Sequence, residues 1–308
     1  RSLSPVSYRN APAKEVLHLD RMILRRRFKA VQPYLWLLPS AALMLVFVFA
    51  PIVQTVWLSL CDISKANLVK GFAGFDNYAA VLKNKTFRKV IENTLVWTVA
   101  TVGVSTLIGF AMAISLNKKF HGRKIARTIL IFPWATALAI TAAMWDYMFD
   151  YEYGALNALL NAVGASSVNW LATPASAFTC MIVVAIVVTV PFITFCLLSG
   201  LQTISSDYYE SASIDGAGAW RQLFHITIPC LRPAFDTSTV LNVIYVFNSF
   251  PIIWTITQGA PAHQTDTITT YLYYLAFKDL KYGRAAALSV IGFLMLLAFA
   301  LLYMKFSM

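Results

Sequence analysis

Six long apolar runs dominate the pattern of hydrophobic and polar positions along the chain. Each is close to the roughly 20 residues that an α-helix needs to cross a bilayer. Prolines lie inside several runs, as transmembrane helices tolerate where neighbours satisfy the freed backbone groups. The pattern predicts an all-α integral membrane protein with six transmembrane helices. The runs cover residues 34–60, 93–116, 126–148, 177–202, 233–257 and 284–308.

The composition supports a membrane protein. Of the 308 residues, 58% are hydrophobic and only 13% are charged, whereas soluble domains carry about 25% charged residues. The formal net charge of +11 could indicate a nucleic-acid partner. The basic residues, however, gather in the N-terminal tail and at the ends of the apolar runs, which is what membrane topology requires. We therefore expect membrane lipid and no nucleic acid as a partner.

Lysine and arginine also predict the orientation. If the N-terminus lies inside, 16 of these residues fall in inner segments and 9 in outer segments. The basic cluster at 83–89 opposes this rule, and we interpret it as an outer surface helix that leads into the second run. Both termini, and the polar segment at 207–229, are therefore expected to be cytoplasmic.

The N-terminal tail, residues 1–32, is expected to be distinct from a membrane domain at 33–308. Val16, Leu19 and Ile23 fall on one face of a possible amphipathic helix, which would lie along the inner leaflet. A disordered basic tail is the alternative.

The longest polar segment of the inner side runs from Asp207 to Pro229. Asp207 and Glu210 have the spacing of a capping box at the start of a short helix. Gly216 permits a turn that a side chain would hinder. A second helix, from Ala217 to about His225, is expected to end before Pro229. Two short helices with small residues on one face would suit a socket on another protein.

This segment resembles the cytoplasmic loop of ABC importer permeases, which reads Glu-Ala-Ala, three residues, Gly, nine residues and Ile-x-Leu-Pro. Ser211 replaces the first alanine and Ile228 the leucine, both conservatively in size. The resemblance implies a type I ABC importer permease fold, in which a coupling loop at 205–231 docks on an ATPase subunit. The residues assigned to this coupling are Glu210, Ser211, Ala212, Asp215, Gly216, Ala217 and Pro229.

The sequence contains no Gly-x4-Gly-Lys-[Ser/Thr] phosphate loop. We therefore expect no cofactor in this chain, with ATP and magnesium bound on the separate ATPase subunit. The four cysteines and four histidines have no metal-ligand spacing. No catalytic constellation is visible, so the chain is not expected to be an enzyme or to hold a metal.

Uncharged polar residues in the fifth run are candidates for the substrate pathway. Asn242, Tyr245 and Ser249 share one helix face, with Asn248 at its edge. Polar groups inside a membrane must face protein or a water-filled cavity. Amides and hydroxyls can exchange hydrogen bonds with sugar hydroxyls. The alternative is that these groups only join neighbouring helices.

The fifth run and the sequence after it resemble carbohydrate permeases of the maltose-transporter type, and with the 207–229 loop this resemblance covers nearly the whole chain from about residue 33. The matches include Phe247-Asn248-Ser249-Phe250, Thr257-Gln258-Gly259-Ala260-Pro261 and Tyr282-Gly283; Ala260 departs from a second glycine. The outer motif Gly74-Phe75-Asp76-Asn77-Tyr78 is similar to the region that meets a substrate-binding protein, although a purely structural role is equally open. The resemblance implies sugar import by alternating access in a bacterial inner membrane. It also implies a second, different permease and two ATPase copies.

No cation lies deep in the six runs, so a neutral di- or oligosaccharide is the preferred substrate. An acidic oligosaccharide or glycerol phosphate is the alternative within the same class. A secondary transporter is less favoured, because coupled carriers place ionisable groups inside their spans, whereas Asp146 and Asp236 lie near run ends.

Overall fold

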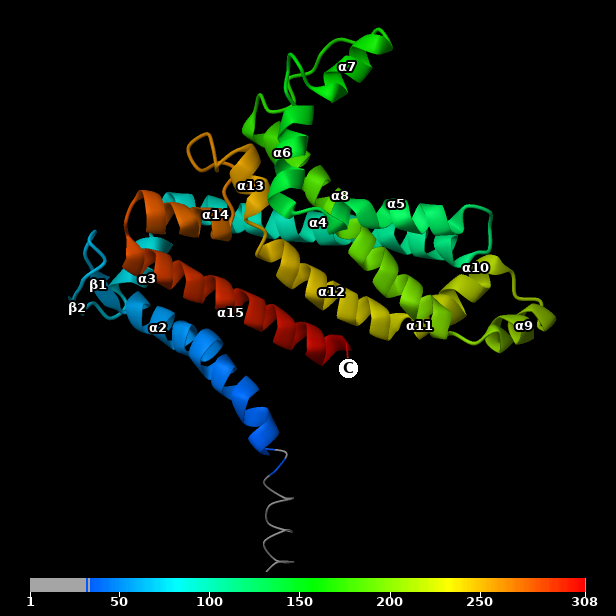
Figure 1. Ribbon diagram of the computed structural model, residues 1–308, viewed down its shortest axis with the longest axis horizontal. Helices are drawn as coiled ribbons and strands as arrows, with labels where there is room; N and C mark the ends of the chain where they lie inside the picture. Colours follow the sequence, from blue (N-terminus) through cyan, green and yellow to red (C-terminus); the bar gives the residue numbers. More distant parts are fainter. Residues whose placement is uncertain (1–31, 33, 308) are drawn as a thin grey trace, which may run out of the picture. The chain divides into compact units, whose positions relative to one another are not determined.

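The computed structural model describes residue 32 and residues 34–307 (Figure 1). The chain divides between Trp57 and Leu58 into two compact units. In the first unit, a helix that begins at Tyr34 contains the π-helical turn η2 (Leu45–Phe49) and enters α2 (Ala50–Ser59). The helix predicted around Val16–Ile23 lies outside the described residues.

The second unit contains one antiparallel sheet of two short strands, β1 (Cys61–Ile63) and β2 (Val69–Phe72). All its other elements are helices. In chain order they are α3 (Asp76–Leu82), α4 (Lys85–Asn117), α5 (Arg123–Ala135), α6 (Leu138–Met148), α7 (Ala155–Ala162), α8 (Pro174–Thr203), α9 (Ser206–Ile214), α10 (Ala219–Gln222), η3 (Leu223–Thr227), α11 (Ile228–Cys230), α12 (Arg232–Phe247), α13 (Pro251–Ile256), α14 (Ile268–Tyr273), η4 (Tyr274–Lys278) and α15 (Tyr282–Ser307).

Five helices among the described residues are long and apolar enough to cross a membrane, and one bent pair is a sixth candidate. Their order agrees with the six predicted runs. The second span starts earlier than its apolar run, at Lys85, where the Asn84 side chain accepts a hydrogen bond from the Thr86 amide (3.0 Å). The basic cluster at 83–89 therefore overlaps the first turn of α4 and does not form a separate surface helix.

Two of the predicted spans are not continuous helices. The third consists of α5 and α6, bent by 96°, because Thr136 and Ala137 adopt extended backbone (ψ 142° and 129°). The fifth leaves the helix at Asn248–Phe250 and resumes with Pro251 in the first turn of α13, where the missing proline N–H costs little.

The core of the second unit is built where α4 packs along α8, with α12 against both. A side chain at Gly109 of α4 would lie 2.7 Å from Ile193 Cγ2 of α8, so the close approach of these helices depends on that glycine. Trp97 of α4 is fully buried, and its indole Nε1 donates to the Val246 carbonyl of α12 (2.9 Å). These contacts fix α12, which carries the candidate pathway residues.

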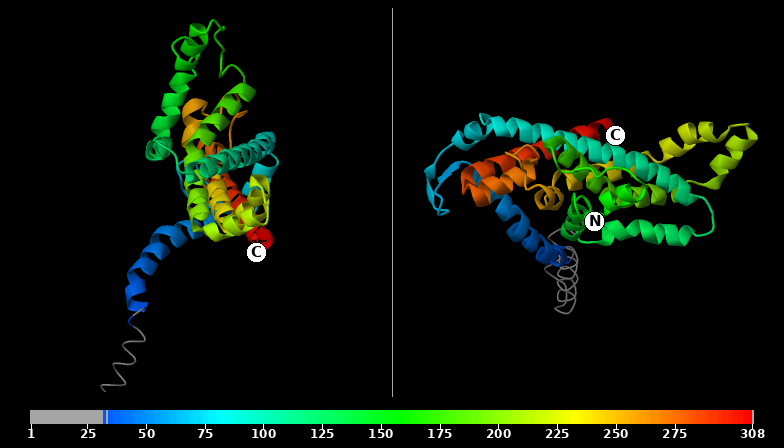
Figure 2. Two further views of the ribbon diagram at one scale, coloured as in Figure 1. Left: turned by 90° about the vertical axis from the view of Figure 1, so that its right-hand side faces the viewer. Right: turned by 90° about the horizontal axis from the view of Figure 1, so that it is seen from above.

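Within this unit, two groups of short elements lie at opposite ends of the long helices. Helices α9 and α10 project together at one end, whereas β1, β2, α3 and α14 gather at the other (Figure 1). The view from above shows the same separation (Figure 2). The arrangement agrees with the prediction that the 207–229 segment and the outer motifs lie on opposite sides of a membrane.

Candidate functional site

The first helix of the predicted coupling loop, α9, ends in a left-handed turn at Gly216. The Gly216 amide donates to the Ser213 carbonyl (3.1 Å), and the Ala217 amide donates to the Ala212 carbonyl (2.8 Å). This pair of bonds is the Schellman motif. Gly216 has a φ of +75°, which other residues adopt only at a cost. The turn predicted at Gly216 is therefore present.

The start of α9 differs from the prediction. Ser205 caps the helix, and its hydroxyl accepts a hydrogen bond from the Asp207 amide (3.3 Å). Asp207 lies instead in the first turn, where its negative charge favours the positive end of the helix dipole. The expected capping box of Asp207 and Glu210 was wrong because a better-placed serine precedes it.

The second helix of the loop continues beyond its predicted end. It runs from α10 through the π-helical turn η3 into α11, which contains Pro229. The wider turn at Leu223–Thr227 ends two residues before Pro229, which lacks an amide donor. The helix resumes beyond it, and the Leu231 amide donates to the Thr227 carbonyl (3.0 Å). The expectation that proline ends this helix was therefore wrong.

Side chains hold the two helices of the loop together. The Gln222 amide nitrogen donates to the Ser213 hydroxyl (2.9 Å) and to the Ala217 carbonyl (3.0 Å). The hydroxyls of Tyr209 and Thr227 lie 3.1 Å apart. The loop is consequently a defined elbow, held in shape by contacts within the chain.

The elbow exposes large apolar side chains. Tyr208, Ile214, Trp220 and Phe224 are exposed by 58–87%. The rings of Trp220 and Phe224 are nearly parallel (18°), with centroids 6.3 Å apart. Trp220 also lines a cavity of about 480 Å³. Exposed apolar groups of this kind, surrounded by polar residues, are typical of a protein–protein interface.

The predicted coupling residues lie around this surface. Glu210, Ser211, Asp215, Gly216 and Pro229 are exposed, whereas Ala212 and Ala217 are half-buried. The sequence analysis did not single out the exposed aromatic pair. The four-residue spacing of Trp220 and Phe224 within a polar segment was the signal that could have found it.

The four candidate pathway residues do not share one helix face. Because α12 ends at Phe247, Asn248 and Ser249 follow the helix and Ser249 falls out of its periodicity. Asn242 is 1% exposed, and its amide nitrogen donates to the Ser105 hydroxyl of α4 (3.2 Å). Ser249 is also buried, and its carbonyl accepts from the Thr269 hydroxyl (3.3 Å). The contact with Ser105 favours an interhelical role for Asn242, and burial makes the Ser249 side chain inaccessible.

Tyr245 and Asn248 are the accessible members of the set. Tyr245 is 45% exposed. Asn248 is exposed, and its amide nitrogen donates to the Ile244 carbonyl (2.8 Å). Its side-chain oxygen accepts no hydrogen bond from the described residues, so it is open to a ligand. The polar contact to substrate predicted for α12 therefore rests on these two residues.

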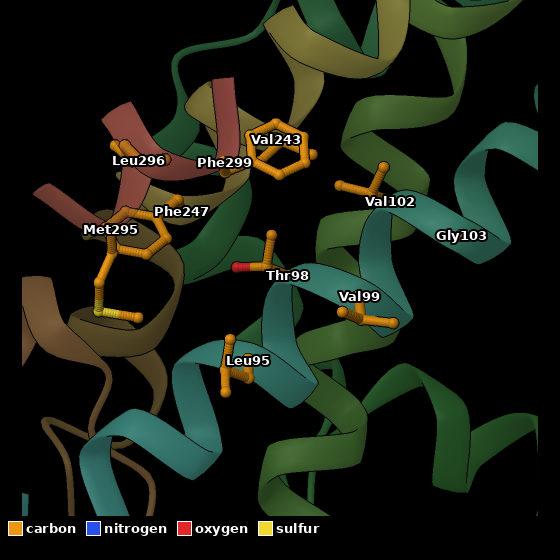
Figure 3. A pocket seen from close by; sticks show the side chains of 10 residues that line it. All are labelled: Leu95, Thr98, Val99, Val102, Gly103, Val243, Phe247, Met295, Leu296 and Phe299. Carbon is orange, nitrogen blue, oxygen red and sulfur yellow. The ribbon is translucent and has the colours of Figure 1, made fainter. Parts of the chain in front are cut away.

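A cavity of about 350 Å³ lies on another side of α12, between α4 and α15. Figure 3 shows its lining side chains converging from the three helices. Apart from Thr98 and Gly103, the lining is entirely aliphatic, aromatic or methionine. A sugar needs several polar partners in its site, so this cavity does not suit one.

A buried polar network fixes the loop between α13 and α14. The Asn93 amide nitrogen of α4 donates to the carbonyls of Gln264 (2.7 Å) and Asp266 (3.0 Å). Asp266 is 1% exposed, and its carboxylate meets His263 Nδ1 at 2.6 Å. Burial raises the pKa of the Asp266 carboxyl, while hydrogen bonds from Thr270 and His263 act in the opposite direction.

This raised pKa predicts a pH-dependent stability. The folded chain binds the Asp266 proton more tightly than the unfolded chain, so the contribution is complete below about pH 3.9 and is lost as the pH rises through the folded-state pKa. Replacing Asp266 by asparagine is expected to flatten this dependence in a thermal-melting series over increasing pH. Asp279→Asn, which removes a half-buried carboxylate beside Lys281, is the control. Identical pH profiles for Asp266→Asn and the wild-type chain would contradict the prediction.

Comparison with known proteins identifies the family. A model of the family described as the binding-protein-dependent transport system inner membrane component matches residues 105–306, which include the elbow and α12. The chain belongs to this family. It is thus a transport permease and not an enzyme, and the family places it in an inner membrane.

Relatives and solved structures agree with this family assignment. The permease is 42% identical over 277 residues to a probable ABC transporter permease protein of Brucella abortus, with 89% of this chain and 96% of the relative covered. It is 36% identical to the trehalose/maltose transport system permease protein MalF of Thermococcus litoralis, over 88% and 92% of the two chains. A bacterial ABC transporter involved in alginate import has the same fold (TM-score 0.82, 23% identity, 92% and 98% covered). The type I importer fold and the maltose-type resemblance are therefore confirmed.

Proposed function

We propose that this permease forms half of the translocation pathway of an ATP-driven importer for di- or oligosaccharides. The exposed elbow at 207–229 carries the proposal, because it is a preformed apolar docking surface on a transport permease. The ATPase partner supplies the force; ATP and magnesium bind there. Closure of two ATPase copies pulls the elbows together, and the spans alternate between inward- and outward-facing states. Both termini then lie in the cytoplasm with the elbow.

The family description supports an extracytoplasmic binding protein as a partner. We further propose a second, different permease subunit, as in maltose-type transporters. The 36% identity to a trehalose/maltose permease supports a sugar substrate. Within α12, which carries Tyr245 and directly precedes Asn248, the only lysine or arginine is Arg232 at its start, which favours a neutral sugar.

Reconstitution tests this function. The permease is co-purified with the chains that accompany it and placed in proteoliposomes with its binding protein. ATP-dependent uptake of labelled maltose or trehalose is the expected result, and an alginate oligosaccharide provides the acidic comparison. Uptake that is driven by an ion gradient without any ATPase subunit would overturn the proposal. Competition by acidic sugars alone would overturn the preference for a neutral substrate.

Charge reversal at Glu210 tests the assignment of the elbow. Glu210→Lys is expected to lower ATP-dependent uptake roughly tenfold or more, because a like-charge contact at an interface costs several kcal/mol. Membrane insertion should be unchanged. Glu152→Lys, an exposed carboxylate between α6 and α7, is the matched control. Normal uptake by the Glu210 variant would remove this residue from the coupling surface.

A further inference from the structure

Four aromatic rings form a continuous cluster beside the break in the fifth span. Phe250 and Trp254 stack with centroids 5.4 Å apart and planes at 18°. Tyr273 meets the ring of Phe250 at 5.0 Å and that of Trp254 at 4.5 Å, and Phe277 follows at 4.8 Å from Tyr273. The two halves of the cluster come from α13 and from the α14–η4 helix, so the loop at 257–267 brings them together.

The orientation of α14 explains why these rings are displayed. Tyr271 is buried, and its hydroxyl accepts a hydrogen bond from Asn84 (2.9 Å). The Ile268 amide donates to the Thr94 hydroxyl of α4 (2.9 Å). Because residues two positions apart lie on nearly opposite sides of a helix, anchoring Tyr271 directs Tyr273 and Phe277 away from α4. The π-helical turn η4, which contains Phe277, is a feature often found at functional sites.

The cluster is only partly covered by the rest of the chain. Phe277 is 63% exposed, and Phe250, Trp254 and Tyr273 are half-buried. Among the described residues, the Tyr273 hydroxyl has no hydrogen-bond partner. Rings that served only to fill a core would be buried. These rings instead combine accessible aromatic surface with a free hydroxyl.

A polar residue lies close to the cluster in the sequence, between the end of α12 and Phe250. Asn248, with its open side-chain oxygen, stands two residues before Phe250. A pyranose ring has one face of C–H groups and a rim of hydroxyls. The C–H face suits the negative face of an aromatic ring, while the hydroxyls suit an amide oxygen and a phenol. Apolar surface with a few placed polar groups is the usual composition of a small-molecule site.

We propose that Phe250, Trp254, Tyr273 and Phe277 form a ring-stacking subsite that receives one sugar unit of the substrate beside Asn248. The subsite rests on the proposed function in sugar import and adds an aromatic contact to the polar residues of α12. Helix α14, which carries Tyr273, lies toward the end of the unit opposite the elbow (Figure 1), so under the proposed orientation a sugar would meet this helix before it reaches Tyr245.

Direct binding to the purified transporter tests the subsite. The complex, with both permeases and the ATPase but without the binding protein, is equilibrated with radiolabelled maltose and, separately, trehalose. Tyr273→Leu and Phe277→Leu remove a ring and keep an apolar side chain. Each is expected to raise the Kd about three- to tenfold, as the loss of one aromatic contact predicts. Tyr273→Phe retains the ring and removes only the hydroxyl, so it should raise the Kd less than Tyr273→Leu does. Phe293→Leu, which removes an exposed ring of α15 (53%), is the matched control.

The outcomes separate this subsite from the import function. If the wild-type complex imports maltose or trehalose and both leucine variants bind it normally, the subsite is wrong and the import function stands. If either leucine variant loses the second permease or the binding-protein response, with Kd unchanged, the cluster is a protein interface and the proposal is overturned. If the wild-type complex neither binds nor imports either sugar, the proposed substrate class and the subsite fail together.

Discussion

Replacing Trp220 by alanine is expected to weaken binding of the ATPase subunit about thirtyfold or more. Trp220 is 74% exposed at the elbow and stacks on Phe224. Tryptophan is enriched among the few interface residues whose truncation costs about 2 kcal/mol or more, which corresponds to about thirtyfold in affinity. The exposure of Trp220 also means that its removal should not disturb the fold.

The measurement is the affinity of the detergent-solubilised permease complex for its ATPase subunit, together with ATP-dependent uptake. Tyr153→Ala is the matched control, since Tyr153 is 73% exposed on the segment between α6 and α7. Both readouts should fall for Trp220→Ala and remain normal for Tyr153→Ala. Unchanged ATPase affinity in the Trp220 variant would show that the docking surface lies elsewhere.

Replacing Gly216 by valine is expected to weaken the coupling between the elbow and the proposed ATPase subunit, because valine would distort the turn. Gly216 has a φ of +75°, and nothing lies within 4 Å of the place where a Cβ would stand. The penalty is therefore one of backbone conformation, of about 1–3 kcal/mol. A distorted turn would lower ATPase affinity and uptake about fivefold to a hundredfold.

Two further variants test whether backbone conformation at residue 216 causes the loss. Gly216→Asn should retain most activity, because asparagine tolerates the left-handed region. Gly218→Val should also be mild, since Gly218 has an ordinary φ of −70° and free space around its Cβ position. Equal losses for valine at both positions would indicate a steric clash with the partner and contradict the conformational explanation.

The sequence predicted the number and order of the spans because hydrocarbon thickness sets the length of an apolar run. It did not predict the break at Thr136–Ala137, since the residues on both sides are apolar and no charge marks the bend. It also did not predict the interruption at Asn248–Phe250. That interruption undermined the assumption that Asn242, Tyr245 and Ser249 share a helix face.

Within the elbow, the prediction was correct where the backbone conformation of one residue decides the structure. It was wrong where the structure depends on contacts with neighbouring residues. Gly216 was predicted as a turn because few other residues adopt its conformation. Pro229 was expected to end a helix, but a π-helical turn at 223–227 precedes it and the helix continues. The exposure of Trp220 and the aromatic cluster depend on which faces of short helices remain uncovered, and apolar periodicity alone does not decide that.

The helical backbone from Ala219 to Phe247 is interrupted only by the turn residue Leu231, between α11 and α12, and this has a mechanical consequence. The Leu231 amide donates to the Thr227 carbonyl (3.0 Å), and the Leu231 carbonyl accepts from the Phe235 amide (2.9 Å), so hydrogen bonds connect the helices that carry Trp220 and Tyr245 across this turn. Under the proposed function, a movement of the elbow on an ATPase subunit would therefore be transmitted through these bonded helices to the region of Tyr245.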